Sequence, residues 1–361
     1  MKTGRRVLSP PHFILKECEV SFELEVLGDN TTTVNEDDLR KNSLHKKAKG
    51  GTELMLEGLQ KRIDPELWNK FNFMMSRVRD EFLEDDDRPA ILWLQDIPED
   101  PESLHLKDPK SRERFAKIVC NSYWQQQQYE LKLGVPVEET TVLKNACESF
   151  PAHVKPEGKK RLIYFSTPHR GLHVLEAAVR WLGNQRDDFE LDVYSSFEIY
   201  GWAEKDKDFE HLYDRLRELD CVNYHGTVSN DKIRDALTQS HILAYPSTYP
   251  ESSCCVAIEA MAAGLLSIMP NHAALTETGT DFAWHYNYET DAAKHAQKFA
   301  TVLNGALDSI DHPSVQSVLK LQTSYYNYFY SWDMRAAQWT DFLKNTLLEI
   351  EQTPARKKYP Y

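Results

Sequence analysis

Short apolar runs and longer segments of helical periodicity follow one another along most of the chain. Apolar runs typical of buried strands occupy 90–94, 115–120, 161–166, 191–194, 241–245 and 265–269. Patterns typical of helices occupy 54–63, 173–182, 211–219 and 256–263. Between residues 161 and 269 the two kinds of element alternate, which predicts an α/β fold with a doubly wound parallel sheet.

The first fifty residues carry the weakest pattern. Residues 21–27 alternate as a strand does, whereas 30–49 are polar and irregular, as in a mobile loop. Gly50 and Gly51 then precede the helix predicted at 54–63. Paired glycines let the backbone approach a ligand closely at a helix N-terminus, although an ordinary tight turn explains them equally well.

The stretch from Tyr245 to Gly264 carries the strongest chemical signal. A buried strand is predicted to end at Pro246, and the helix 256–263 to end at Gly264, a residue suited to a C-cap. Glu251 precedes this helix and Glu259 lies within it. The unbonded amides at the helix start can hold a phosphate, and Glu259, on an otherwise apolar helix, can accept hydrogen bonds from ribose hydroxyls. The residues carrying those amides are Ser253, Cys254 and Cys255.

This stretch resembles the retaining nucleotide-sugar glycosyltransferases of the GT-B fold, family 4 (glycosyl transferases group 1). That family carries two glutamates separated by seven residues after a Pro-Ser turn, and the likeness continues through 260–264 and Leu275-Thr276-Glu277. The resemblance implies two Rossmann-like domains facing a cleft, with the last helix crossing back to the N-terminal domain. It assigns Glu251 to the transferred sugar, Glu259 to the ribose, and the loop at 50–51 to the cleft.

The family also supplies basic residues for the diphosphate, and here the pattern is incomplete. Arg170 stands where the family has a lysine before Gly171, and a guanidinium grips phosphate oxygens well. Thr167 stands near the place of the usual arginine, so a second cation is missing, and His169 is a weak candidate to replace it. We expect Thr167 to lie beside the donor.

Two further positions carry donor or acceptor assignments. Gln95 stands where many relatives have a histidine, and Asp96 beside it is expected to contact the acceptor, or to form a turn before Pro98. His225 lies in a loop that the resemblance places near the nucleoside base, although such a histidine is also common as a structural residue.

Composition limits the classes of function. The 361 residues suit about two domains, expected at 1–152 on the acceptor side and 153–330 on the donor side, with a returning helix at 331–361. A net charge of −13 opposes nonspecific binding to nucleic acid or anionic membrane. The six cysteines lack metal-binding spacing and suggest reduced thiols. No apolar stretch reaches the length of a signal or membrane segment, so a cytoplasmic protein is expected.

The sequence therefore predicts transfer of a sugar from a nucleoside diphosphate sugar to an acceptor hydroxyl, with retention and without a cofactor or metal ion. The expected acceptor is a glycan or another small hydroxyl compound. Three alternatives stay open: a metal-dependent transferase using Asp85 and Asp87, an inactive nucleotide-sugar-binding module, and a transferase acting on modified bases in DNA.

Overall fold

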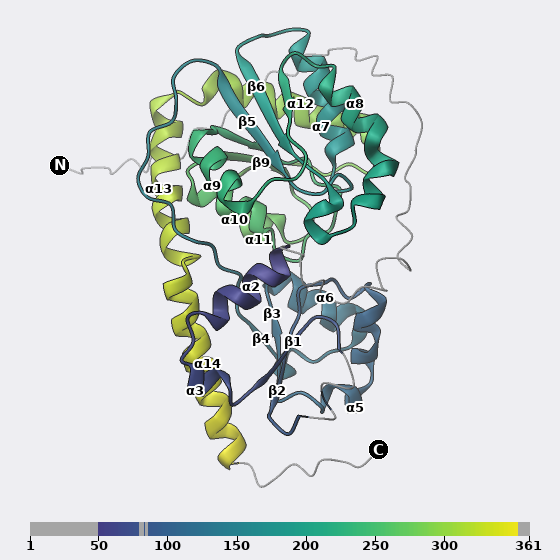
Figure 1. Cartoon of the computed structure of the whole chain (residues 1–361), viewed down its shortest axis with the longest axis vertical. Coiled ribbons are helices and arrows are strands. Elements are labelled where there is room, and N and C mark those ends of the chain that lie inside the picture. Colours follow the sequence, from purple (N-terminus) through teal and green to yellow (C-terminus); the bar gives the residue numbers. More distant parts are fainter. Residues whose placement is uncertain (1–49, 79–82, 84–85, 353–361) are drawn as a thin grey trace, which may run out of the picture.

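The protein is built on two parallel sheets, one in each half of the chain (Figure 1). The computed structural model describes residues 50–78, 83 and 86–352. The strand predicted at 21–27, the irregular segment 30–49 and Asp85 lie outside these residues.

Among the described residues, the N-terminal sheet has four parallel strands in the order β1-β2-β3-β4. They are β1 (Asn72–Met75), β2 (Ala90–Trp93), β3 (Lys117–Cys120) and β4 (Thr140–Val142). β2 and β3 lie within the apolar runs predicted from sequence. β1 was not predicted, because its four residues follow a short helix directly and give little periodicity to read.

The C-terminal sheet has six parallel strands in the order β10-β9-β8-β5-β6-β7. They are β5 (Lys160–Phe165), β6 (Phe189–Tyr194), β7 (Val222–Tyr224), β8 (Ile242–Ala244), β9 (Leu266–Pro270) and β10 (Trp284–Tyr286). The strand order reverses between β5 and β8, which is the point where a doubly wound sheet opens a crevice for ligands. The predicted doubly wound α/β class is confirmed.

Helices connect the strands in both halves. The N-terminal half contains α2 (Gly51–Gln60), α3 (Pro65–Trp68), η1 (Pro101–Lys107), α5 (Pro109–Arg112), α6 (Tyr123–Leu133) and η2 (Val137–Glu139). The C-terminal half contains α7 (Leu172–Gly183), η3 (Phe197–Tyr200), η4 (Ala203–Phe209), α8 (Glu210–Arg217), α9 (Asn230–Gln239), α10 (Cys255–Ala262), α11 (Leu275–Gly279), α12 (Ala292–Ser309) and α13 (Pro313–Phe329). α2 starts three residues earlier than predicted, since Gly50 serves as its N-cap.

Local signals explain how several helices begin and end. Ser122 caps α6 by accepting a hydrogen bond from the Gln125 amide at 2.9 Å. Gly264 follows α10 with φ of 78°, the left-handed conformation expected of a glycine after a helix. Leu275-Thr276-Glu277, likened to a loop ending in glutamate, instead belongs to the short helix α11, which the buried Leu275 anchors.

The last helix, α14 (Trp332–Gln352), returns to the N-terminal half, as Figure 1 shows along the edge of the molecule. Its Trp339 is fully buried and its ring lies 4.7 Å from that of Trp93 on β2. The crossing runs beside the interdomain linker, where the Cys147 amide donates to the Tyr330 carbonyl at 2.8 Å. The N-terminal core is therefore completed by residues from the far end of the chain.

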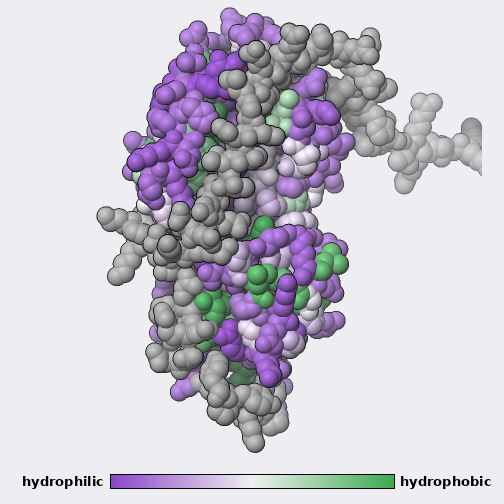
Figure 2. Space-filling model, turned by 90° about the vertical axis from the view of Figure 1, so that its right-hand side faces the viewer, coloured by the Kyte–Doolittle hydropathy of each residue, from purple (hydrophilic) through white to green (hydrophobic). Residues whose placement is uncertain are grey.

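The surface is mostly polar on the face shown in Figure 2, with small hydrophobic groups on the lower, N-terminal half. Large apolar side chains exposed in that half are Leu104, Tyr123, Leu131 and Val137. In the described part of the chain, no helix combines the length and the hydrophobicity needed to cross a membrane.

Candidate active site

A cleft of about 2590 Å³ lies between the two halves and takes side chains from both. Most residues singled out from sequence line it: Gly50, Gly51, Asp96, Thr167, Arg170, Glu251, Ser253, Cys254, Cys255 and Glu259. Residues far apart in sequence thus share one cavity at the strand ends, where α/β folds bind their ligands.

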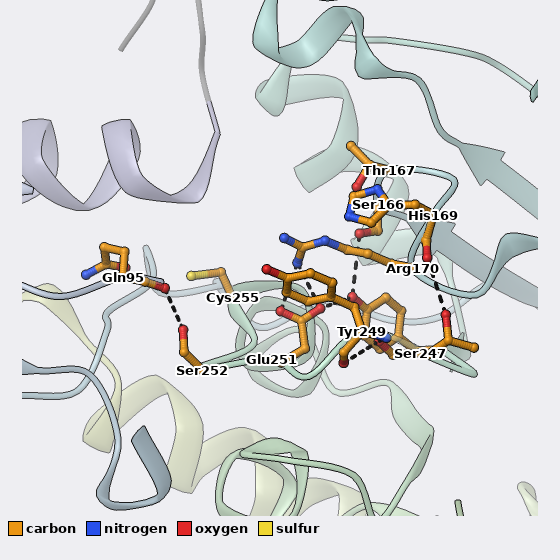
Figure 3. Close-up of polar contacts among 12 residues, drawn as sticks. Gln95, Ser166, Thr167, His169, Arg170, Ser247, Tyr249, Glu251, Ser252 and Cys255 are labelled. Carbon is orange, nitrogen blue, oxygen red and sulfur yellow. Dashed lines mark hydrogen bonds and ion pairs between the residues drawn. The ribbon is translucent and has the colours of Figure 1, made fainter. Parts of the chain in front are cut away.

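Glu251 and Arg170 form a buried ion pair at the centre of the cleft (Figure 3). One terminal nitrogen of the guanidinium lies 2.8 Å from each carboxylate oxygen. The Tyr245 hydroxyl donates a further hydrogen bond to the same carboxylate at 2.6 Å. Although burial opposes the charged form, the Glu251 carboxylate and nearby phenols hold the pKa of Arg170 well above its usual value.

The backbone around this pair explains its position. Gly171 has φ of 97°, and a Cβ there would lie 2.1 Å from the Pro246 carbonyl oxygen, so only glycine fits where the turn before α7 meets the loop after β8. The Tyr249 ring lies 4.7 Å from the Arg170 guanidinium and covers it. The pair is therefore held by the turn, the loop and an aromatic face.

The N-terminus of α10 opens into the cleft close to that of α2. Cys254 is its N-cap, and among the described residues no side chain makes a capping hydrogen bond there, so the amides at the helix start are placed to bind an anion. A Cβ on Gly51 would lie 3.7 Å from the Cys255 sulfur, which places the two helix starts side by side. Asn145 donates to that sulfur at 3.5 Å, while its own buried oxygen has no partner among the described residues.

Glu259 lies one turn further along α10 and lines the same cleft. Within the described residues its carboxylate makes no hydrogen bond and no ion pair. Burial raises the pKa of Glu259 to about 7, with Arg234 opposing the shift and Glu148 adding to it. A half-buried acceptor of this kind suits a ligand that offers hydroxyl groups.

Asp96 faces this centre from the N-terminal half. The Ser76 hydroxyl oxygen accepts hydrogen bonds from the amides of Gln95 and Asp96, at 2.6 and 3.0 Å, and so fixes the turn after β2. Burial, followed by the Asp100 carboxylate, raises the pKa of Asp96, while Arg77 and Arg170 oppose the rise. Asp96 is thus placed to contact a ligand from the side opposite Glu251.

His169 is not a second cation. Burial, followed by the charges of Arg170 and Lys205, lowers the pKa of His169 to about 3, so the ring is neutral at physiological pH. It stacks on Phe197 with ring centres 5.3 Å apart. The Thr167 hydroxyl beside it is buried without a partner in the described part of the chain. His169 and Thr167 therefore offer neutral groups near the place of the missing arginine.

His225 does not line the cleft. Its Nε2 lies 2.7 Å from an Asp192 oxygen and its ring stacks on Tyr194. The next two residues of the loop, Gly226 and Thr227, do line the cleft.

Buried polar atoms without a partner gather along the cleft. Within residues 50–78, 83 and 86–352, cleft-lining side chains with such atoms are Gln95, Asn145, Thr167, His169, Arg170, Ser195 and Trp202. An unpaired buried polar group costs about 1–3 kcal/mol, so this concentration indicates a polar ligand that satisfies them. In the same part of the chain no three His, Cys, Asp or Glu side chains are grouped to hold a metal ion.

The structure adds residues that the sequence did not reveal. Tyr200, Glu53 and Ser76 line the cleft without any recognisable motif around them. Tyr245 and Tyr249 precede Glu251 by six and two residues, and this closeness in sequence was the one signal that could have pointed to them. Ser252 bridges the halves, since its hydroxyl donates to the Gln95 carbonyl at 2.6 Å.

Comparisons with known proteins agree with this geometry. Residues 147–309 match the model of the family described as Glycosyl transferases group 1. A comparison with curated proteins gives no significant match.

Solved structures show the same fold over most of the chain. Anabaena HepE in complex with UDP and glucose has a TM-score of 0.61 at 16% identity, with 81% of this chain and 82% of that chain covered. A glycosyltransferase from Rickettsia africae has a TM-score of 0.62 at 14% identity, covering 89% and 88%. Sucrose-phosphate synthase from Thermosynechococcus elongatus has a TM-score of 0.61 at 13% identity, covering 78% and 74%. The chain thus has the two-domain GT-B fold, and its residues 147–309 match the model of the glycosyl transferases group 1 family.

Proposed function

We propose that this protein is a family 4 glycosyltransferase that moves a sugar from a nucleoside diphosphate sugar to an acceptor hydroxyl, with retention of anomeric configuration and without a metal ion. The proposed acceptor is a glycan or another small hydroxyl compound. The N-terminal half, as far as about residue 152, would bind it, and 153–330 would bind the donor.

The observation that carries this proposal is the grouping of three features around one helix start. The free amides of α10, the Arg170 guanidinium and the unpaired Glu259 carboxylate all face one cleft. Amides and guanidinium suit a diphosphate, and the carboxylate suits ribose hydroxyls. The diphosphate and the ribose are the two chemical parts that a nucleoside diphosphate sugar presents besides its base and its transferred sugar.

In the proposed reaction, the bond between the anomeric carbon and the diphosphate oxygen breaks and its electrons pass to the diphosphate. Arg170 and the α10 amides stabilise this charge, while Glu251 accepts hydrogen bonds from the sugar hydroxyls. The acceptor oxygen attacks from the same face, and a donor phosphate oxygen takes its proton. Asp96 orients the acceptor, and such positioning can supply roughly 7–11 kcal/mol of the barrier reduction.

The first donor to test is UDP-glucose, because Anabaena HepE was solved with UDP and with UDP-glucose. We would incubate the protein with UDP-, GDP- and ADP-glucose, with and without EDTA, and measure thermal stabilisation and release of the nucleoside diphosphate. We expect one nucleotide class to stabilise the protein and to be released slowly, equally with and without EDTA.

The other outcomes are distinct. Binding without release, even with candidate acceptors present, would favour an inactive binding module. Loss of release with EDTA would exclude the metal-independent reaction, and binding of no donor would overturn the proposal. The anomeric configuration of the product, read by NMR, decides retention.

A further inference from the structure

In the described residues, every basic side chain that lines the cleft already contacts at least one protein oxygen. In the described part of the chain, those lining it are Lys61, Arg62, Arg77, Arg88, Arg170 and Arg234. Each lies within ion-pair or hydrogen-bond distance of a carboxylate or carbonyl oxygen. Arg170, the one at the centre, gives one nitrogen to both oxygens of Glu251. The charge of a departing diphosphate therefore calls for additional neutral donors.

Tyr200 offers such a donor at the right place. It lies at the end of η3 and lines the cleft. A Cβ built on Gly50 would lie 2.4 Å from the Tyr200 ring, so the ring packs against the start of α2 in the other half. Its hydroxyl makes no hydrogen bond within the described residues. The side chain thus spans the gap between the halves with its donor unused.

The charges around the phenol agree with this position. Burial is the largest influence on the pKa of Tyr200 and raises it. The charge of Arg170 lowers this pKa and that of Glu251 raises it, each by less than burial does. The phenol is therefore protonated at physiological pH and lies near the Arg170–Glu251 pair. A protonated phenol beside a guanidinium is suited to donate to the anion that the guanidinium binds.

The segment that carries Tyr200 is held rigidly. The Ser196 hydroxyl accepts from the Glu198 amide at 2.9 Å and caps η3. Asp206 holds the same turn by accepting from the Phe197 amide at 2.9 Å and from the Tyr213 hydroxyl at 2.7 Å. Preorganised donors of this kind cost little reorganisation during reaction.

We propose that Tyr200 is a further catalytic residue, whose phenol donates a hydrogen bond to the diphosphate of the donor and strengthens it as the glycosidic bond breaks. The phenol keeps its proton throughout, and the negative charge stays on the phosphate oxygen. This inference rests on the proposed function.

The test compares wild type, Tyr200→Phe and the control Tyr328→Phe, whose tyrosine is 69% exposed on α13 and lies outside the cleft. Phenylalanine keeps the ring against Gly50, so we expect an unchanged thermal midpoint. The probes are UDP, GDP and ADP, the matching nucleosides, and the three glucose donors. For the nucleotide that wild type binds, we expect Tyr200→Phe to lose about 10- to 100-fold in donor cleavage and in diphosphate affinity, since a hydrogen bond to a charged group is lost.

Affinity for the nucleoside alone should stay the same in Tyr200→Phe, because the missing contact is to phosphate. If Tyr200→Phe cleaves the donor and binds the diphosphate as well as wild type does, the assignment of Tyr200 is overturned while the proposed function stays intact. An equal loss for nucleoside and diphosphate would also overturn it, since that pattern marks a general disturbance of the cleft. If wild type binds none of the probes, the proposed function fails and this inference fails with it.

Discussion

The two halves of the molecule differ in how much of their structure and candidate site can be recognised from short stretches of sequence. The C-terminal half has a six-stranded sheet, the paired glutamates and a family match that begins at residue 147. In the described part of the N-terminal half there are four strands of three or four residues, and the core is closed by α14 from the end of the chain. The loop and the helix that carry the proposed donor contacts Glu251 and Glu259 lie close in sequence, whereas the opposite wall of the cleft depends on contacts between distant segments.

The halves nevertheless build one site. Glu277 on α11 accepts hydrogen bonds from the amides of Tyr123 and Trp124 at the start of α6, at 3.0 and 2.8 Å. It also forms an ion pair with Lys144. Together with the bond from Ser252 to Gln95, these contacts join the loop that carries Glu251 to the strand ends of the N-terminal half.

The dependence of the N-terminal half on α14 should give the largest effect on stability. Trp339→Ala removes a fully buried ring that packs on Trp93, and we expect a loss of about 3–5 kcal/mol in the free energy of unfolding. Hydrogen exchange should rise more in β1–β3 than in β5–β9. In the matched variant Phe299→Ala, on α12 of the other half, the order should reverse. Equal losses of protection in both halves would refute this division.

A comparison of two arginines distinguishes a catalytic role from a purely structural one. Arg170→Ala should slow donor cleavage roughly 10²–10³-fold, because it removes the charge that meets the leaving group. Arg112 in the N-terminal half is more deeply buried, with 7% of its side chain exposed against 23% for Arg170, and its Nε lies 2.6 Å from a Glu139 carboxylate oxygen. Arg112→Ala should lower stability by about 1–3 kcal/mol and leave turnover per folded molecule unchanged. Similar turnover in the two variants would remove the catalytic assignment of Arg170.

Glu259→Gln should weaken the donor and stabilise the free protein. Because the folded pKa of about 7 lies above the usual 4.5, ionisation costs stability as pH rises between these values. We expect the variant to be more stable than wild type by about 1–3 kcal/mol at pH 8 and equal to it near pH 4.5. Donor affinity should fall about tenfold, because an ionised acceptor is lost. Unchanged donor affinity would contradict the ribose assignment, and calorimetry at several pH values measures both effects.

The paired glycines test how the N-terminal half reaches the donor. Gly50→Ala places a Cβ 2.4 Å from the Tyr200 ring and should lower donor affinity about tenfold by displacing that ring. Gly51→Ala places its Cβ 3.7 Å from the Cys255 sulfur, an ordinary contact, and should change affinity little. Titration of both variants with the bound nucleotide sugar distinguishes them. If Gly50→Ala and Gly51→Ala both keep wild-type donor affinity, the Tyr200 ring can move aside without weakening donor binding.

The sequence by itself determined the features that depend on near neighbours. Alternating apolar runs predicted the parallel sheet of the C-terminal half, and the spacing of Glu251 and Glu259 marked a candidate donor site on a loop and a helix that both line the cleft. β1 and the helical form of α11 were missed, because such short elements are set by the packing of neighbouring segments rather than by their own periodicity.

Only the tertiary structure decided which distant groups meet. It paired Arg170 with Glu251 across 81 residues, turned His225 toward Asp192 outside the cleft, and brought Tyr200 against Gly50. It also made His169 neutral by burial, which the turn sequence did not reveal. Helix and strand patterns arise from interactions over a few residues, whereas burial, pKa and ion pairing depend on segments that packing alone brings together.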